Sequence, residues 1–196
     1  RFTSRNCRRV CAGRFDPASL TFDVETNGQV DLSGRFYATN VLFDAAGRCV
    51  LFGWIRGFQD PHGWNGVLSL PREVRIGHDG HLRQTPVREL ECLRGRSKQY
   101  GSVRIDGTPT GFGWPVTTLE LRAVVEPGNA ASCGIRFRSA DNAGSLFSLV
   151  CGVSAGGTDE AVLPIPAPAR GRAVQIHVFV DRTVMEVFVD DGMSCF

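Results

Sequence analysis

The chain has 196 residues, enough for one domain with a hydrophobic core or for two small ones. Hydrophobic residues make up 42% and charged residues 21%, which is ordinary for a globular protein and unlike a disordered one. The 22 basic and 20 acidic side chains are interspersed, and every apolar run is far shorter than the roughly 20 residues of a membrane helix. This composition argues against both nucleic acid and a membrane as partners.

The N-terminal half predicts short β-strands separated by turns. A strand over 9–15 ends where Asp16-Pro17 favours a turn. Residues 36–43 and 48–55 flank a turn that closes with Gly47, which predicts a β-hairpin. Shorter strands are expected over 66–69, 73–76 and 81–84, the last two joined by a turn at 78–80.

The C-terminal half predicts longer strands after a polar linker at 90–100, which includes a short helical turn near 87–93. In 117–125, apolar and polar residues alternate, as in a sheet with one buried face. Similar strands are expected over 133–138, 146–151, 174–180 and 184–189. Five such strands in about 80 residues predict a β-sandwich. Residues 194–196 resemble the start of a strand that stops short.

The seven cysteines are scattered along the chain, and their odd number leaves at least one thiol outside any set of disulfides. Cys7 and Cys11 form one close pair, but no second pair stands at the spacing that a zinc site needs. No metal ligands and no cofactor are therefore assigned. The cysteines also leave the cellular compartment open. The four histidines show no catalytic pattern, and His177 in mid-strand is expected to be structural.

Four sequence blocks resemble the end of the catalytic domain of glycoside hydrolase family 32, the family of invertases, inulinases, levanases and related fructosyl-transferring enzymes. In chain order they are Gly34-Arg35-Phe36-Tyr37-Ala38, Val50-Leu51-Phe52-Gly53-Trp54-Ile55, Gly63-Trp64-Asn65-Gly66 and Ser69-Leu70-Pro71-Arg72. Residues 178–188 are similar to the family's C-terminal hairpin, in which a valine-aspartate pair precedes a glutamate-x-phenylalanine strand.

The resemblance implies an all-β fold. Residues 1–88 would be the last blade of a five-bladed β-propeller, 89–94 a linker and 95–196 a C-terminal β-sandwich whose last strand is truncated. A lone blade exposes apolar surface, so we expect 1–88 to be poorly ordered or aggregation-prone by itself, whereas 95–196 could fold. Limited proteolysis that spared 1–88 and cut within 110–190 would contradict this expectation.

The resemblance also implies that the chain starts too late to carry the catalytic carboxylates. Retaining glycoside hydrolysis needs two carboxyl groups about 5–5.5 Å apart. Glu91-Cys92 copies the family's acid/base pair but follows the blocks that it should precede, and Arg14-Phe15-Asp16-Pro17 echoes another block with one residue inserted. The nucleophile's Asn-Asp-Pro block has no counterpart. No residue of this chain is therefore assigned as catalytic.

Three residues are candidates for contact with a sugar. Tyr37 lies on a strand whose counterpart in the family borders the sugar pocket, and Trp54 could supply an aromatic wall. Asp31 precedes that strand, although Ser33 stands where the family usually has glycine. Phe36 and Trp54 could equally be core residues of the hairpin.

The expected function is that of a fragment of a retaining glycosidase that cleaves terminal β-fructofuranosyl bonds in sucrose or fructans, with the chain alone inactive. Two alternatives remain: a fructosyltransferase of the same family and a non-catalytic carbohydrate-binding or interaction module. In the intact enzyme the partner would be a sugar, sucrose or fructan. The sequence leaves the substrate's length and the oligomeric state open.

Overall fold

The computed structural model describes residues 9–57, 63–138, 145–152, 162–165 and 172–196. These residues form β-strands in mainly antiparallel sheets, with one short 3-10 helix, η1 (Arg88–Leu93). The strands are β1 (Arg9–Asp16), β2 (Thr21–Gln29), β3 (Phe36–Phe43), β4 (Cys49–Ile55), β5 (Val67–Leu68), β6 (Arg72–Ile76), β7 (Leu82–Pro86), β8 (Thr118–Val125), β9 (Ser132–Arg138), β10 (Ser145–Gly152), β11 (Val162–Ile165), β12 (Val174–Asp181), β13 (Val184–Val189) and β14 (Ser194–Cys195).

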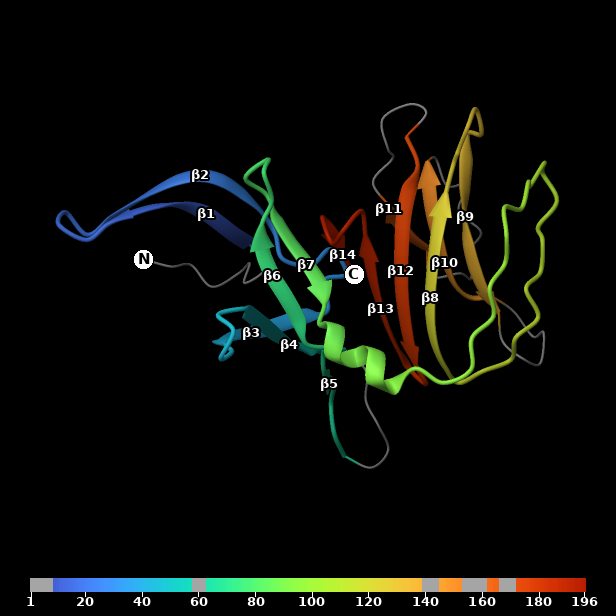
Figure 1. Ribbon diagram of the computed structural model, residues 1–196, viewed down its shortest axis with the longest axis horizontal. Coiled ribbons are helices and arrows are strands. Elements are labelled where there is room, and N and C mark those ends of the chain that lie inside the picture. Colours follow the sequence, from blue (N-terminus) through green and yellow to red (C-terminus); the bar gives the residue numbers. More distant parts are fainter. Residues whose placement is uncertain (1–8, 58–62, 139–144, 153–161, 166–171) are drawn as a thin grey trace.

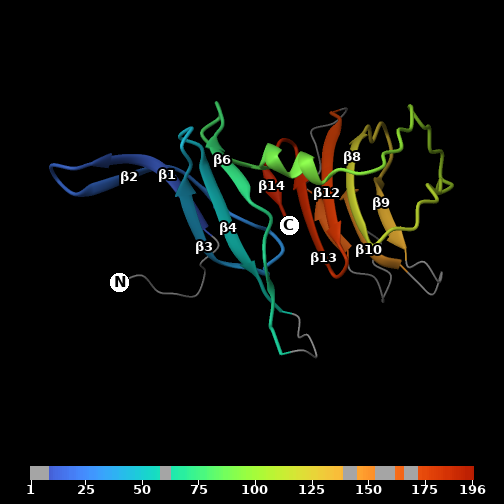
Figure 2. The same cartoon turned by 60° about the horizontal axis from the view of Figure 1, so that its bottom comes forward.

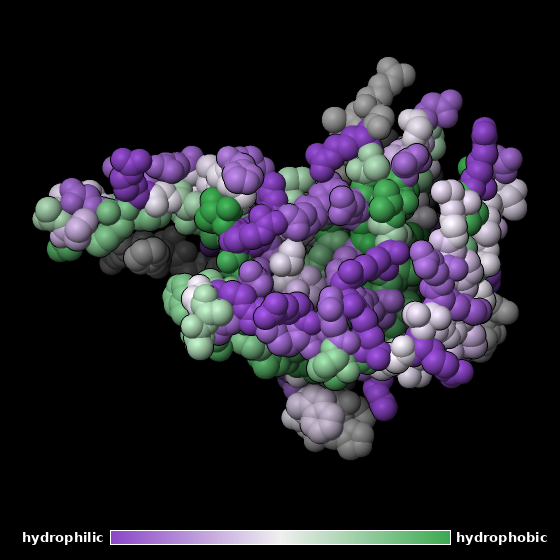
Figure 3. Space-filling view, viewed as in Figure 1, coloured by the Kyte–Doolittle hydropathy of each residue, from purple (hydrophilic) through white to green (hydrophobic). Residues whose placement is uncertain are grey.

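Strands β1 and β2 form an antiparallel ribbon that projects from the rest of the molecule (Figure 1). The turn between them is held by Asp16, whose carboxylate accepts hydrogen bonds from the Ala18 amide at 2.9 Å and the Ser19 hydroxyl at 2.6 Å. Polar and apolar side chains lie side by side along this ribbon (Figure 3), and Phe15 and Phe22 are both largely exposed. Strand β2 is absent from the sequence prediction, which ended the first strand correctly at this turn.

Strands β3, β4, β6 and β7 form one antiparallel sheet, and β5 pairs with β4 beside it. The predicted hairpin of 36–43 and 48–55 is confirmed as β3 and β4. Its turn contains Gly47 at φ 79°, a conformation that glycine adopts without strain. Asp44 fixes the same turn, because one of its carboxylate oxygens accepts the amides of Ala46 and Arg48, each at 2.9 Å.

Helix η1 follows β7 and lies between the N-terminal sheet and the C-terminal sheets in both views (Figures 1 and 2). It confirms the helical turn expected near 87–93. The chain from residue 94 to residue 117 then contains no strand, and most of its side chains are exposed. Regular pairing resumes at β8, which begins at Thr118.

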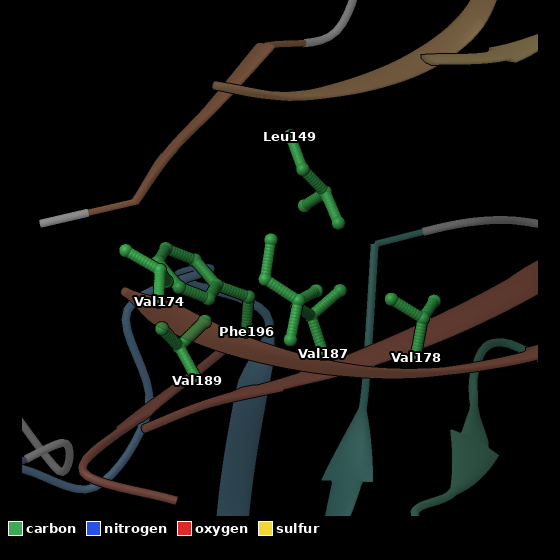
Figure 4. Packing of buried hydrophobic residues seen from close by; sticks show 7 residues of the cluster. Leu149, Val174, Val178, Val187, Val189 and Phe196 are labelled. Carbon is green, nitrogen blue, oxygen red and sulfur yellow. The ribbon is translucent and has the colours of Figure 1, made fainter. Parts of the chain in front are cut away.

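Two sheets pack face to face in the C-terminal half, with strand orders β14-β13-β12-β8 and β11-β10-β9. Figure 4 shows Leu149 of β10 facing side chains of the other sheet, among them Val178 and Val187. The buried residues of this core are Leu149, Val174, Ile176, Val178, Val187, Val189 and Phe196. The alternation in the sequence predicted the inward side of β8 and β9, where Leu121, Cys133, Ile135 and Phe137 pack against this core. It missed β11, which pairs with β10 in parallel.

The N-terminal sheet and the C-terminal sheets touch through backbone as well as side chains. The amide of Gln84 in β7 donates to the carbonyl of Gly192 at 3.1 Å, and that of Leu32 donates to the carbonyl of Cys195 at 2.8 Å. Residues expected to begin a truncated strand form β14, which pairs with β13. Across the ranges that the structure describes, no helix is long and apolar enough to cross a membrane.

Candidate functional site

Tyr37 and Trp54 lie opposite each other on β3 and β4 and form an aromatic pair in which Trp54 is exposed and Tyr37 is partly buried. Their ring centroids are 6.3 Å apart in an edge-to-face arrangement, and 37% of Trp54 is exposed. The guanidinium of Arg56 lies over the Tyr37 ring, 4.5 Å from its centroid. The Trp54 indole N–H donates to the Asn65 carbonyl at 2.9 Å, so the ring's orientation is set. Such a surface offers flat ring faces and nearby hydrogen-bonding groups.

The backbone beside Tyr37 is irregular. The register between β3 and β4 shifts between Tyr37 and Asn40, and Ala38 has φ 48°, a value that residues with a Cβ rarely adopt. A bulge of this kind bends a strand and changes where neighbouring side chains point, and it is common beside binding sites. The start of β3 is therefore shaped differently from the regular remainder of the hairpin.

The third candidate, Asp31, is in the interior. It is only 2% exposed, and its carboxylate pairs with Arg72 of β6, whose Nη1 lies 3.2 Å from Oδ2. The other carboxylate oxygen accepts the amide of Ser33 at 2.9 Å. Asp31 thus belongs to the contact between sheets and not to the surface that carries Tyr37 and Trp54.

Arg72 is the centre of a buried ion network that the sequence analysis did not find. The side chain is 1% exposed, and its Nη2 lies 2.8 Å from Oε2 of Glu186 in β13. Its Nη1 also donates to the side-chain oxygen of Gln84 at 3.3 Å. With Asp31, the guanidinium therefore meets two carboxylates and an amide. The sequence feature that could have indicated this network is Glu186, the single charged residue within the apolar strand 184–189.

Two aromatic rings enclose the same guanidinium. Arg72 Cζ lies 4.1 Å from the centroid of the Phe36 ring and 5.1 Å from that of Phe188. Phe36 comes from β3 and Phe188 from β13, so the cation is held between rings of the two halves of the molecule. Cation–π contacts of this kind gain strength when water is excluded.

Asp31 and Glu186 are two carboxyl groups that meet around one cation, so they can be compared with a glycosidase pair. Burial raises the pKa of Glu186 above its ordinary value, although Arg72 opposes the shift. However, Glu186 is only 4% exposed, and Oε1 already accepts the Leu70 amide at 2.6 Å. No sugar can reach the two groups. Burial likewise raises the pKa of the neighbouring Cys195 thiol to about 12, which keeps it protonated and unreactive.

The two short matches to catalytic blocks have ordinary structural roles. Glu91 and Cys92 are exposed in η1, and Glu91 pairs with Arg94 at 3.1 Å. Asp16 ends β1 and holds the turn described above. Within the described ranges, no group of three or more His, Cys, Asp or Glu side chains is placed to bind a metal ion.

His177 is part of a polar cluster on the outer face of β8 and β12. Its Nε2 lies 2.8 Å from Oε1 of Glu120. The Arg94 guanidinium hydrogen-bonds to Glu120 and lowers the pKa of that carboxyl to about 2, against the effect of its partial burial. Burial lowers the pKa of His177, although Glu120 opposes this shift. His177 thus lies in mid-strand with Glu120 as its partner, and the structural role expected for it stays a prediction.

We expect the Glu120 cluster to make stability depend on pH in acid. The carboxyl titrates at about 2 in the folded chain and near 4.5 when unperturbed, so its contribution is present above pH 4.5 and is lost as pH falls towards 2. Because solvent screens this partly exposed pair, E120Q should cost on the order of 1 kcal/mol at pH 7. Urea unfolding of both proteins from pH 7 to pH 3 should show this difference shrinking below pH 4.5. A difference that stays constant would contradict the assignment, and E25Q, which removes a carboxylate from an exposed pair with Arg14, is the control.

Sequence comparison identifies the family. Residues 2–86 match the model of the glycosyl hydrolases family 32 N-terminal domain. The raffinose invertase of Escherichia coli is 29% identical over 196 aligned positions, covering 93% of this chain. A sucrose-6-phosphate hydrolase of Zymomonas mobilis is 28% identical and covers 88% of it. The match to the family model assigns residues 2–86 to glycoside hydrolase family 32. The chain spans 40% of the length of the first of these relatives and 37% of that of the second.

Two solved enzyme structures share this fold. The sucrose-6-phosphate hydrolase of Lactobacillus gasseri superposes with a TM-score of 0.70 at 20% identity, covering 93% of this chain and 40% of that one. A fructan 1-exohydrolase from Cichorium intybus in complex with 1-kestose superposes with a TM-score of 0.52 at 17% identity, covering 94% and 47%. Both superpositions extend over the N-terminal and the C-terminal sheets.

Proposed function

We propose that this chain is part of a retaining glycosidase that cleaves terminal β-fructofuranosyl bonds in sucrose or fructans. The observation that carries the proposal is the extent of the likeness: an invertase and a sucrose-6-phosphate hydrolase align with nearly the whole chain. The solved relative that holds 1-kestose supports a fructose-containing substrate. The chain itself carries no catalytic carboxylate pair in this proposal, because Asp31 and Glu186 are enclosed around Arg72.

In this proposal, residues 1–88 are the last blade of a five-bladed β-propeller, 89–94 a linker and 95–196 a β-sandwich. The sheet β3-β4-β6-β7 supports the first assignment, since blades are small antiparallel sheets. The two sheets around Leu149 support the last, because their inner faces build one core. Helix η1 falls on the linker between them.

Tyr37 and Trp54 supply a sugar-facing surface at the edge of the substrate pocket. Trp54 is exposed and Tyr37 is partly exposed beside it, whereas the neighbouring Phe36 is buried at 3% exposure. A sugar presents C–H groups on its ring faces, and these pack well on aromatic rings. Asp31 is left out of this role because it is buried.

The chain alone is expected to bind without hydrolysing. Incubation with sucrose or inulin should release no glucose or fructose, whereas the protein encoded by the complete reading frame should release both from sucrose. Hydrolysis by the chain alone would refute the proposal that this chain carries no catalytic carboxylate pair. Sugar binding by the complete protein without any release would favour a binding module, and transfer of fructose to a second sucrose would favour a fructosyltransferase.

Removing the Trp54 ring should weaken sugar binding. W54A loses about 1 kcal/mol of ring contact, which corresponds to a roughly fivefold to tenfold higher Kd for sucrose or 1-kestose. Steady-state hydrolysis by the complete protein would show this change as a higher KM, and W114F, outside this aromatic pair, is the control. Equal KM values in W54A and the unaltered protein would exclude Trp54 from the sugar-facing surface.

A further inference from the structure

Glu186 is distant from Tyr37 and Trp54 in the sequence and lies in another sheet, yet two chains of contacts join it to them. One passes through Arg72 and the ring of Phe36. The other passes through Leu70 and Ser69 to the backbone beside Trp54. Both begin at the one carboxylate of Glu186.

The first chain of contacts uses the enclosed guanidinium. Glu186 holds Arg72 through Nη2 at 2.8 Å and Nε at 3.3 Å. Arg72 in turn lies against the Phe36 ring at 4.1 Å. Phe36 is directly followed by Tyr37, and successive side chains of a strand point to opposite faces. Fixing Phe36 on the inner face therefore fixes the direction of Tyr37 on the outer face.

The second chain of contacts uses the backbone. Oε1 of Glu186 accepts the Leu70 amide at 2.6 Å. The preceding residue, Ser69, exchanges two hydrogen bonds with Gly53: its amide donates to the Gly53 carbonyl at 2.8 Å, and its hydroxyl accepts the Gly53 amide at 3.0 Å. Trp54 follows Gly53 in β4.

The two chains meet at Gly53. A Cβ atom added there would lie 2.3 Å from Cζ of Phe36, so the ring rests directly on the backbone of β4. This backbone is thus held by the Phe36 ring from one side and by Ser69 along its edge. Both supports lead back to Glu186, and no other described carboxylate hydrogen-bonds to both Arg72 and Leu70.

We propose that Glu186 is a positioning residue for the sugar-facing pair Tyr37 and Trp54. It acts from the C-terminal sheet through Arg72 and Leu70, and so couples that sheet to the substrate surface. The effect of Glu186 on sugar binding rests on the proposed function, in which Tyr37 and Trp54 contact the sugar. The positioning itself can nevertheless be tested without a sugar, because Trp54 reports its own surroundings.

The test records the indole N–H resonance of Trp54 in the unaltered 196-residue chain and in variants, assigned by its loss in W54F. E186A should shift this resonance by more than its linewidth, because both supports are lost. E186Q keeps an oxygen that can accept the Leu70 amide. Its Trp54 resonance should therefore lie much closer to that of the unaltered chain than the resonance of E186A does. E120A, which removes a glutamate from the outer face of the same sheet, should leave it in place.

S69A provides a second route should E186A fail to fold. It removes the hydroxyl that accepts the Gly53 amide and leaves Glu186 intact, and it should also shift the Trp54 resonance. A resonance that does not move in folded E186A, or in folded S69A, would overturn the proposal. If Glu186 served only the stability of the fold, its replacement would lower the free energy of unfolding without shifting the Trp54 resonance in particular.

Titration with sucrose and 1-kestose then separates the two claims. In the complete protein, E186A should weaken sugar binding about tenfold, since small misplacements of binding groups have large effects. If the unaltered complete protein binds neither sugar, the proposed function fails, while the Trp54 resonance still decides whether Glu186 positions this pair. If the resonance moves but sugar affinity is unchanged in E186A, the positioning has no role in binding and the inference fails.

Discussion

Replacing Arg72 with methionine is expected to lower the free energy of unfolding by about 3–5 kcal/mol, because the substitution leaves two carboxylates buried without their cation. Asp31 and Glu186 are 2% and 4% exposed, so water cannot replace the lost hydrogen bonds. The loss is a large part of the roughly 5–15 kcal/mol that stabilises an ordinary domain. Urea unfolding followed by circular dichroism would measure it.

The matched control is R75M on the same strand. Arg75 pairs with Asp191, but both side chains are about half exposed, at 47% and 56%. A surface pair of this kind contributes about 0–1 kcal/mol. The double variant R72M/E186Q should recover part of the loss of R72M, because one of the two unpaired charges is then removed. Equal stabilities of R72M and R75M would contradict the view that the Arg72 network is important for the fold.

Truncating Leu149 to alanine is expected to cost about 2–5 kcal/mol, through lost apolar contacts and the cavity left behind. Leu149 is fully buried, and it faces the strands β12 and β13 from the opposite sheet (Figure 4). The cavity would open between two sheets, where neither can move alone to fill it. Thermal and urea unfolding of L149A would measure the loss.

Leu68 offers the control, since it is 69% exposed on the short strand β5. L68A should change the free energy of unfolding by about 0.5 kcal/mol or less. A cost for L149A close to that of L68A would mean that the two C-terminal sheets are not held together by this core. The residues around Leu149 would then need another role.

The elements that the sequence predicted well are those with local signals. The β3–β4 hairpin has alternating strands and a turn closed by Gly47, and all these signals lie within 36–55. The alternation in β8 and β12 likewise marks a buried face. Strand β11 was missed because four residues around Pro164 carry little alternation, and its pairing with β10 is parallel. A parallel pairing requires a connection that brings the two strands side by side, and it leaves no hairpin turn or other local pattern in the sequence.

The candidate site divides in the same way. Tyr37 and Trp54 were singled out by their blocks, and the structure brings them together as cross-strand neighbours. The Arg72 network was missed because Arg72 and Glu186 are separated by 114 positions, and charged residues are normally exposed. Asp31 was a candidate for sugar contact because it precedes β3, but its side chain points into the interior and pairs with Arg72.

The spacing of the Arg72 network also affects how the protein is made. Arg72 and Asp31 leave the ribosome long before Glu186, which follows Arg72 by 114 residues. At a synthesis rate of about 5–20 residues per second, on the order of ten seconds pass between them. During this time the guanidinium lacks one of its two carboxylates, and the ring of Phe188 has not been made. The N-terminal sheet therefore cannot complete the ion pairs of Arg72 until the last strands of the chain have been synthesised. Nascent chains that stall before residue 186 should be preferred substrates for chaperones and proteases.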